Sequence, residues 1–195
     1  MRCLRSAGST GAICSRKVKS MKGFPQHNIS SETALDILKN SDVLRNVYVS
    51  GKIELPSGEH WANGINIHNC VIEHFECVMV SFEKPISITN TEFKNCTFTF
   101  SYFLQGFKIE DSLFKNSLDF QAGFHNKPTF PFVLKGNAFN NFVNFFDCQF
   151  ESDVEIIKND FKAGTNILSQ TLMIQFDVPP LIEGNIGQLA CETEQ

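Results

Sequence analysis

Four residues of the types that bind zinc lie within ten positions of one another. They are His68, Cys70, His74 and Cys77. A structural zinc site needs four such ligands converging tetrahedrally. The repeat described below places Cys70 in an interior position equivalent to that of Thr91, with the histidines pointing outward. The sequence therefore predicts no metal site in this segment.

The carboxylates do not follow the pattern expected of a sugar-cleaving enzyme. Such enzymes place two carboxyl groups about 5–10 Å apart, and on a coiled fold the pair would recur one coil apart on one exposed face. The acids of the repetitive region do not form such a row; they are Glu73, Glu92, Glu110, Asp119 and Glu155. A single row would be needed to line a cleft, so the acids predict no glycosidase site.

Nucleophile and phosphate-binding motifs do not occur either. The chain has no Gly-x-Ser-x-Gly motif and no glycine-rich loop ahead of a helix. Cys96 and Cys148 are interpreted as thiols that fill the core. The sequence thus predicts no catalytic residue, no cofactor-binding residue and no cofactor, and the chain is interpreted as not being an enzyme.

Apolar residues recur every 10 or 11 positions through the middle of the chain. These anchors are Ile72, Phe82, Phe93, Phe103, Phe114, Phe124, Phe139, Phe150 and Phe161. The one step of 15 contains residues 125–128, interpreted as a four-residue surface insertion. A second apolar pair follows most anchors at +4 and +6, and such alternation is typical of β-strands. After Phe93 the pattern places this pair one residue late, at Phe98 and Phe100.

A mostly small residue precedes each anchor by two positions and so shares its strand face. These residues are Cys70, Val80, Thr91, Ser101, Ser112, Ala122, Asn137, Cys148 and Asn159. One small and one large side chain per strand would fill a narrow tube. Two 11-residue half-coils make a coil of 21–22 residues. The prediction is an all-β chain, a right-handed parallel β-helix of about five or six coils.

The period also predicts which side chains stack along the axis. We expect one interior column with one residue per coil, made of Ile72, Phe93, Phe114, Phe139 and Phe161. Asn69, Asn90 and Asp111 recur at the same 21-residue interval, as do Asn95 and Asn116. Their side chains can hydrogen-bond from coil to coil, or asparagine can be present because it tolerates turns.

Three triplets carry a resemblance to a known family. They are Cys96-Thr97-Phe98, Ser101-Tyr102-Phe103 and Cys148-Gln149-Phe150. In these the chain resembles pentapeptide-repeat proteins, right-handed β-helices in which a small residue, then often Asp or Asn, then Leu or Phe recurs every five positions. The middle position differs here, and most of the chain keeps a period of 10–11. The resemblance covers about residues 65–168 and implies the fold. For function it implies, at most, mimicry of nucleic-acid charge, as some members show against topoisomerases.

Three regions are predicted along the chain. Residues 1–28 are expected to be a disordered or leader segment, and residues 29–178 one solenoid with a short N-terminal capping helix at Ser30–Lys39. This helix segment has a serine cap, early acids and a late lysine. Leu172–Phe176 is the last expected strand, because Pro179 and Pro180 stop pairing. Residues 179–195 are expected to be a C-terminal tail.

Charge is distributed unevenly. Residues 1–22 hold six Lys and Arg and no acid, whereas the remainder holds eleven basic and twenty-one acidic residues. The basic segment is open to three interpretations: a mitochondrial-type presequence, a nucleic-acid-binding arm, or a leader with translation starting at Met21. The acidic body disfavours binding to nucleic-acid phosphates.

Cysteine usage and hydropathy bear on the compartment. Seven cysteines at irregular spacings suggest no disulfide framework, and no stretch fits a secretory signal or a membrane span. The expected location is the cytoplasm, or the mitochondrion if residues 1–22 are a presequence. We expect a protein-interaction or scaffolding module whose partner is another protein, with no nucleic-acid or membrane partner; the alternative is a carbohydrate-active or carbohydrate-binding β-helix.

Overall fold

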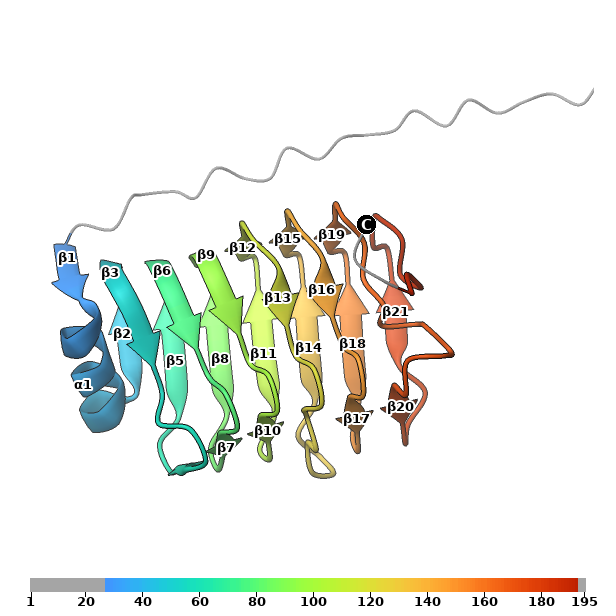
Figure 1. Cartoon of the computed structure of the whole chain (residues 1–195), viewed down its shortest axis with the longest axis horizontal. Helices are drawn as coiled ribbons and strands as arrows, with labels where there is room; N and C mark the ends of the chain where they lie inside the picture. Colours follow the sequence, from blue (N-terminus) through green and yellow to red (C-terminus); the bar gives the residue numbers. More distant parts are fainter. Residues whose placement is uncertain (1–26, 193–195) are drawn as a thin grey trace, which may run out of the picture.

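Short strands that alternate between buried and exposed residues wind the chain into a parallel β-solenoid of about seven coils (Figure 1). The computed structural model describes residues 27–192. The predicted all-β parallel solenoid with one short helix is confirmed. The predicted count of five or six coils is too low, because irregular coils at both ends also pair with their neighbours.

Every strand pairing is parallel, and the strands form stacked sheets on the sides of the solenoid. The nine-stranded sheet contains β1 (His27–Ser30), β3 (Val47–Glu54), β6 (Val71–Glu76), β9 (Glu92–Thr97), β12 (Leu113–Phe114), β13 (Leu118–Asp119), β15 (Ala138–Phe139), β16 (Val143–Asn144) and β19 (Asp160–Phe161). The seven-stranded sheet contains β2 (Val43–Arg45), β5 (Ile65–His68), β8 (Ile86–Thr89), β11 (Phe107–Glu110), β14 (Phe132–Lys135), β18 (Val154–Ile157) and β21 (Leu181–Glu183). The nine-stranded sheet spans two sides, because β12 pairs with the start of β9 and β13 with its end. A further side is formed by β4 (His60–Trp61), β7 (Ser81–Phe82), β10 (Tyr102–Phe103), β17 (Gln149–Phe150) and β20 (Gln175–Phe176).

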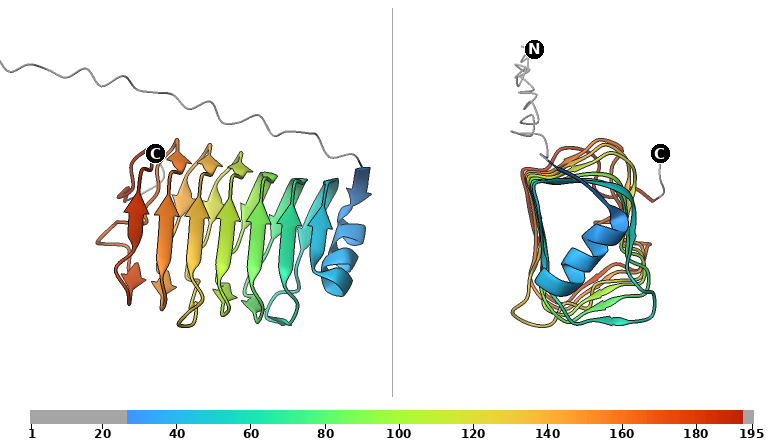
Figure 2. Two further views of the ribbon diagram at one scale, coloured as in Figure 1. Left: turned by 180° about the vertical axis from the view of Figure 1, so that it is seen from behind. Right: turned by 90° about the vertical axis from the view of Figure 1, so that its left-hand side faces the viewer.

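Each coil has four faces, as the end-on view in Figure 2 shows. Each face directs two residues inward, two positions apart. In one coil these buried pairs are Ile86/Ile88, Thr91/Phe93, Cys96/Phe98 and Ser101/Phe103. The 11-residue half-coil of the sequence therefore corresponds to two faces of about five residues each.

The predicted interior column is confirmed. Strand register aligns Ile72, Phe93, Phe114, Phe139 and Phe161 on successive coils, and all five are buried. Adjacent rings stack with centroids 5.0 Å apart for Phe93–Phe114, 5.2 Å for Phe114–Phe139 and 4.9 Å for Phe139–Phe161. Large rings at one coil spacing therefore fill the tube along its length.

The expected slip after Phe93 is in the wrong direction. The inward pair is Cys96 and Phe98, one residue early, because Cys96 aligns with Phe75 and Leu118 in the neighbouring coils. A cysteine in an apolar position hid this alignment from the sequence pattern. Phe100 consequently lies at a corner and is exposed.

The small position expected at Ala122 is occupied by Gly123 instead. The backbone N–H of Phe124 donates to the carbonyl of Ser101, as Tyr102 donates to Val80 one coil earlier. Phe124 thus has the register of an outward residue, but its φ of +89° turns the ring inward. The ring stacks on Phe150 with centroids 4.5 Å apart.

Gly123→Ala is expected to lower the free energy of unfolding by about 1–3 kcal/mol, the typical cost of overpacking a core. A Cβ at residue 123 would lie 2.7 Å from the Ser101 carbonyl oxygen and 3.0 Å from that of Phe120, and neither backbone atom can move cheaply. Urea unfolding measures the effect. Gly64→Ala is the control, since its Cβ would come no closer than 3.5 Å to a neighbour. Equal midpoints for the two variants would contradict the assignment.

The helix predicted at Ser30–Lys39 is present as α1 (Ser31–Ser41). Its N-cap Ser30 accepts a hydrogen bond from the Thr33 N–H at 3.3 Å. Ala34 and Leu38 are buried against the first coil, and Figure 2 shows α1 lying across that end of the solenoid. The helix therefore covers the N-terminal end of the core.

Both predicted domain boundaries differ from the pairing. His27 and Asn28 belong to β1, while residues 1–26 of the predicted leader lie outside the described residues. After Pro179 and Pro180 the chain pairs again, since β21 aligns with β18 and Ile186 with Asp160. The two prolines stand between β20 and β21, where no ladder N–H is needed. Strand pairing thus continues beyond the predicted start of the tail at residue 179, as far as Ile186.

The predicted stacking is confirmed for Asn69 with Asn90 and for Asn95 with Asn116, on the outside of the solenoid, whereas Asp111 makes no side-chain hydrogen bond to Asn90. The Asn69 amide donates to Asn46 at 2.7 Å, Asn90 to Asn69 at 2.9 Å, and Asn116 to Asn95 at 2.8 Å. Asn46, Asn69 and Asn90 also have positive φ, a conformation that asparagine tolerates. Turn preference and stacking therefore act together at this corner.

A second, interior ladder was not predicted. Asn137 and Asn159 occupy small positions, and each side-chain oxygen accepts the backbone N–H of the preceding coil, from Ser112 at 2.9 Å and from Asn137 at 3.0 Å. Asn185 accepts from Asn159 in the same way, at 2.9 Å. These side-chain amides therefore provide hydrogen-bond partners for buried backbone N–H groups of neighbouring coils.

Candidate functional site

The four zinc-type residues of the sequence are separated by the wall of the solenoid. Cys70 and Cys77 are buried inside, and His68 and His74 are exposed on β5 and β6, which belong to different sheets. His68 Nδ1 lies 2.7 Å from the Thr89 hydroxyl. Residues 27–192 contain no group of three or more His, Cys, Asp or Glu side chains able to hold a metal ion.

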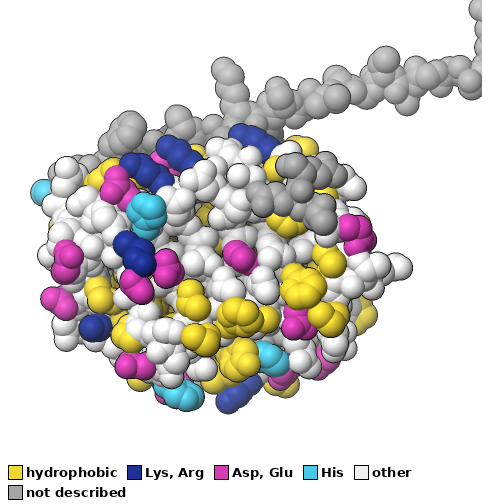
Figure 3. All heavy atoms as spheres, viewed as in Figure 1, with side chains coloured by type: hydrophobic (Ala, Val, Ile, Leu, Met, Phe, Trp, Pro, Cys, Tyr) yellow, Lys and Arg dark blue, Asp and Glu magenta, His cyan; other side chains and the backbone are white. Residues whose placement is uncertain are grey.

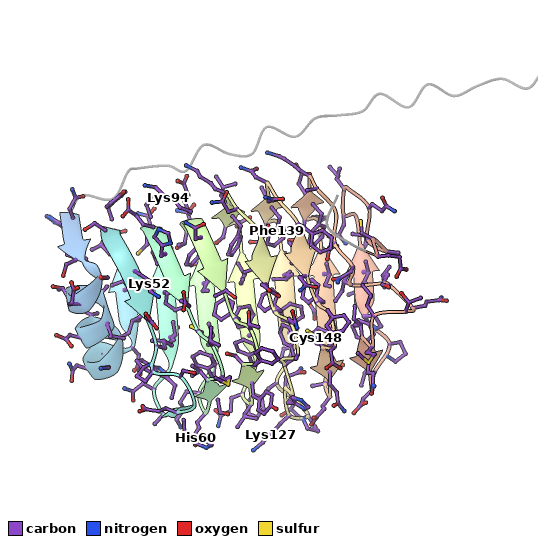
Figure 4. The ribbon with its side chains drawn as sticks, viewed as in Figure 1. Lys52, His60, Lys94, Lys127, Phe139 and Cys148 are labelled. Carbon is purple, nitrogen blue, oxygen red and sulfur yellow. The ribbon has the colours of Figure 1, made fainter. Side chains whose placement is uncertain are left out.

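The cysteines of the described region are free thiols with little access to solvent. Burial raises the pKa of Cys70, and it also raises the pKa of Cys148. The Cys148 thiol donates to the Phe120 carbonyl at 3.2 Å, within the interior shown in Figure 4. Neither thiol has the lowered pKa that makes a cysteine nucleophilic.

Thiol titration is expected to leave Cys70 and Cys148 unmodified until the protein is denatured, because the reactive thiolate is disfavoured and the atoms are inaccessible. The measurement is mass spectrometry of each cysteine after alkylation, with and without denaturant. Stoichiometric zinc in the purified protein, lost on Cys70→Ser or His74→Ala, would contradict this assignment.

The acids considered in the sequence lie on different sheets or at different strand positions. Glu110 and Glu155 are on the seven-stranded sheet, in different register positions, and Glu73, Glu92 and Asp119 are on the nine-stranded sheet. Glu92 is paired with Lys115 and Glu110 with Lys108. The structure brings no two of the five onto one row of adjacent coils.

The most strongly perturbed carboxylate is Glu73. It accepts hydrogen bonds from the Gly51 N–H at 2.9 Å, from Lys94 Nζ at 2.8 Å and from the Tyr48 hydroxyl at 2.6 Å. These donors lower the pKa of Glu73 to about 2, the Gly51 N–H most of all. The same contact raises the pKa of Lys94, labelled in Figure 4. Both groups therefore stay charged at neutral pH and tie β3, β6 and β9 together.

Two corners of the coil place residues in the left-handed conformation, and their residue types differ. The corner after the seven-stranded sheet holds Asn46, Asn69, Asn90, Asp111, Gly136, Lys158 and Gly184. The corner between the nine-stranded sheet and the β4–β7–β10 side holds Gly58, Met79, Phe100, Ala122, Asp147 and Met173. Asn, Asp and Gly adopt this conformation readily, whereas Met and Phe do so at a cost.

The second corner also carries large apolar side chains that are exposed to solvent. Met79 and Met173 are each 54% exposed, Phe100 is 46% exposed, and neighbouring Tyr102 is 41% exposed. Figure 3 shows apolar side chains gathered on this face of the molecule. We call Met79, Phe100, Tyr102, Phe146, Leu172 and Met173 the apolar corner.

A shallow cavity of about 320 Å³ adjoins the apolar corner. Phe146 and Leu172 belong to its walls, and Asp119, Asn144 and Asn166 supply polar groups. The Asn166 amide donates to Asn144 Oδ1 at 2.8 Å, and the Asn144 amide donates to Asp119 Oδ1 at 2.9 Å. An apolar strip and a polar ladder thus lie side by side.

The apolar corner was not predicted, although the sequence spacing of Met79 and Phe100 marks it. Met79 and Phe100 each stand three positions before an anchor, the phase at which Asn69 and Asn90 occur at the other corner. A left-handed turn favours Asn, Asp or Gly, so large apolar residues at these positions are not explained by the turn itself.

Comparisons with known proteins identified no relative of this chain. No family model, no curated protein and no solved structure matched the chain. Among residues 27–192, no helix is long and apolar enough to cross a membrane. The class that the fold defines is a parallel β-solenoid with one capping helix.

Proposed function

We propose that this chain is a non-catalytic interaction module that binds another protein through the apolar corner. The observation that carries the proposal is that Met79, Phe100 and Met173 are exposed and also have a left-handed backbone conformation. A left-handed residue other than Gly, Asn or Asp costs about 1–2 kcal/mol, and exposed apolar patches mark interaction sites. The exposed part of these side chains contributes little to the core, and binding to a partner would account for apolar residues at this costly position.

The double variant Met79→Asn, Phe100→Asn is expected to be at least as stable as the parent, by up to about 1 kcal/mol, because asparagine tolerates the left-handed conformation. Its binding to protein partners is expected to fall at least about tenfold, since the apolar contacts are lost. Partners recovered from the source cells are quantified by mass spectrometry, and affinity is then measured by calorimetry with each purified partner.

Leu181→Thr provides the control, because Leu181 is 50% exposed on the seven-stranded sheet, away from the corner. It should keep every partner that the double variant loses. If the double variant retains those partners at parental affinity, the apolar corner is not the binding surface.

The resemblance to pentapeptide-repeat proteins is retained as part of the proposal. The four-faced coil supports it, as do the inward small and large residues of Cys96/Phe98, Ser101/Phe103 and Cys148/Phe150. Charge mimicry of nucleic acid receives less support, because the acids are dispersed over several faces. A protein partner bound through apolar contacts is the favoured form.

The proposed compartment is the cytoplasm. Free, buried thiols at residues 70, 77, 96, 148 and 191 suit a reducing environment. The mitochondrial alternative depends on residues 1–22, which lie outside the described residues.

Carbohydrate binding is the second candidate, and the cavity beside the corner favours it. Asp119 and Asn144 offer polar groups and Phe146 an aromatic wall, a combination suited to a sugar ring. A glycan array together with assays on acidic polysaccharides tests this candidate. Binding that is lost in Asn144→Ala, or cleavage of any polysaccharide, would favour it over the protein-interaction proposal.

A further inference from the structure

Acidic side chains border the apolar corner on both sides. Glu54, Glu76 and Asp119 lie in register with one another on the nine-stranded sheet. Asp147 is at the corner itself. On the other side, Glu83, Glu151 and Asp177 each stand four positions after a corner residue. An apolar strip with this border fits a segment that carries both cationic and apolar side chains.

Several of these acids have no cationic neighbour. Lys52 is paired with Glu54 and Glu76, and His60 and His125 with Glu83 and Glu151. In the part of the chain that the structure describes, no basic side chain is within ion-pair distance of Asp119, Asp147 or Asp177. After Lys162 the sequence contains no further Lys or Arg. The negative charge is thus least compensated toward the C-terminal half of the corner.

The chain itself contains a segment of the complementary kind. Residues 1–22 carry six Lys and Arg and no acid, and they also contain apolar residues such as Leu4, Ile13 and Val18. Opposite charges on the segment and on the corner attract each other. Because both belong to one chain, the effective concentration of the segment at the corner is in the millimolar range, which favours their association further.

The tether is long enough. The described chain begins at His27, which pairs with Val47 in the first coil. From there to Phe100 the path over the surface is about 40 Å, at ~3.3 Å per residue around the coil and ~4.8 Å per coil along the axis. Twenty-six residues can span up to about 90 Å when extended. At that rate about 12 residues are needed to cover the path, so residues 1–15, which include Arg2 and Arg5, can reach the apolar corner of their own molecule.

We infer that residues 1–15, the start of this basic segment, bind the apolar corner of the same molecule and compete there with the protein partner. This inference rests on the proposed function, because it gives that binding surface a self-encoded, charge-dependent competitor. Salt weakens the contact, since ionic attraction across exposed surfaces is screened.

The full chain provides its own sites for testing the inference by photo-cross-linking. The five cysteines of the described region are buried, so a benzophenone maleimide applied under native conditions is directed to Cys3 and Cys14. Irradiation in 50 mM salt is expected to cross-link the label to Met79, Phe100 or Tyr102, as read by peptide mass spectrometry. Yield is expected to fall about fivefold in 1 M salt.

Paired substitutions separate charge complementarity from chance proximity. Asp147→Asn with Asp177→Asn is expected to lower the yield about threefold, because two uncompensated charges are removed. Asparagine suits the left-handed Asp147, so the fold is kept. Glu155→Gln with Glu183→Gln, on the seven-stranded sheet, removes the same charge elsewhere and should leave the yield unchanged.

Three results would overturn the inference. They are cross-links confined to α1 or the seven-stranded sheet, a yield indifferent to salt and to both double variants, and cross-linked dimers whose yield rises with concentration, which would assign the segment to a second copy. Each leaves the partner-binding test with Met79→Asn, Phe100→Asn unaffected, so failure here is distinct from failure of the proposed function.

Discussion

Replacing Phe114 with alanine is expected to lower the free energy of unfolding by about 3–5 kcal/mol, the range for truncating a buried phenylalanine. The Phe114 ring is buried between Phe93 and Phe139, with centroids 5.0 and 5.2 Å away. A coil contacts only its neighbours, so a cavity in the middle of the stack weakens two interfaces together. The loss is a large part of the ~5–15 kcal/mol that stabilises a typical protein.

Equilibrium denaturation monitored by circular dichroism measures this loss. Phe100→Ala is the matched control: the same substitution at an exposed corner residue should change stability by about 0.5 kcal/mol or less. Glu155→Ala, on the outside of the seven-stranded sheet, should also stay within about 0.5 kcal/mol. Similar losses at residues 100 and 114 would show that the interior column does not carry the stability assigned to it.

Asn159→Ala is expected to cost about 2–4 kcal/mol, because it leaves two buried backbone groups without partners, each worth about 1–3 kcal/mol. The Asn159 oxygen accepts the N–H of Asn137 at 3.0 Å, and its amide donates to the carbonyl of Leu134 at 2.9 Å. No apolar residue can replace both interactions.

The exposed ladder provides the comparison for Asn159. Asn95 accepts the Asn116 amide at 2.8 Å on the outside of the solenoid, where water can replace the lost bond. Asn95→Ala should therefore cost only about 0.5–1 kcal/mol. Thermal unfolding of the two variants side by side measures the difference, and equal costs would mean that the interior ladder is not needed to satisfy the buried backbone.

Periodicity in the sequence was sufficient to predict the parallel solenoid and the column from Ile72 to Phe161, and the capping and charge pattern of Ser30–Lys39 predicted the helix. The reason is local: the alternation of side chains along a strand and the 21–22-residue coil together decide which residues point inward and which stack. The asparagine ladders on the outside followed from the same interval. The absence of a catalytic constellation remains a prediction from the residues alone.

Only the tertiary structure decided the features that deviate from the repeat. Both Phe124 and Phe100 have positive φ, yet Phe124 is buried and Phe100 is exposed, a difference that two phenylalanines do not reveal in the sequence. Asn137 and Asn159 looked merely slim in the sequence, yet their role depends on backbone groups one coil away. The candidate site arises in the same way, since exposure at Met79 and Phe100 is set by backbone angle and by neighbouring coils, which residue spacing does not specify.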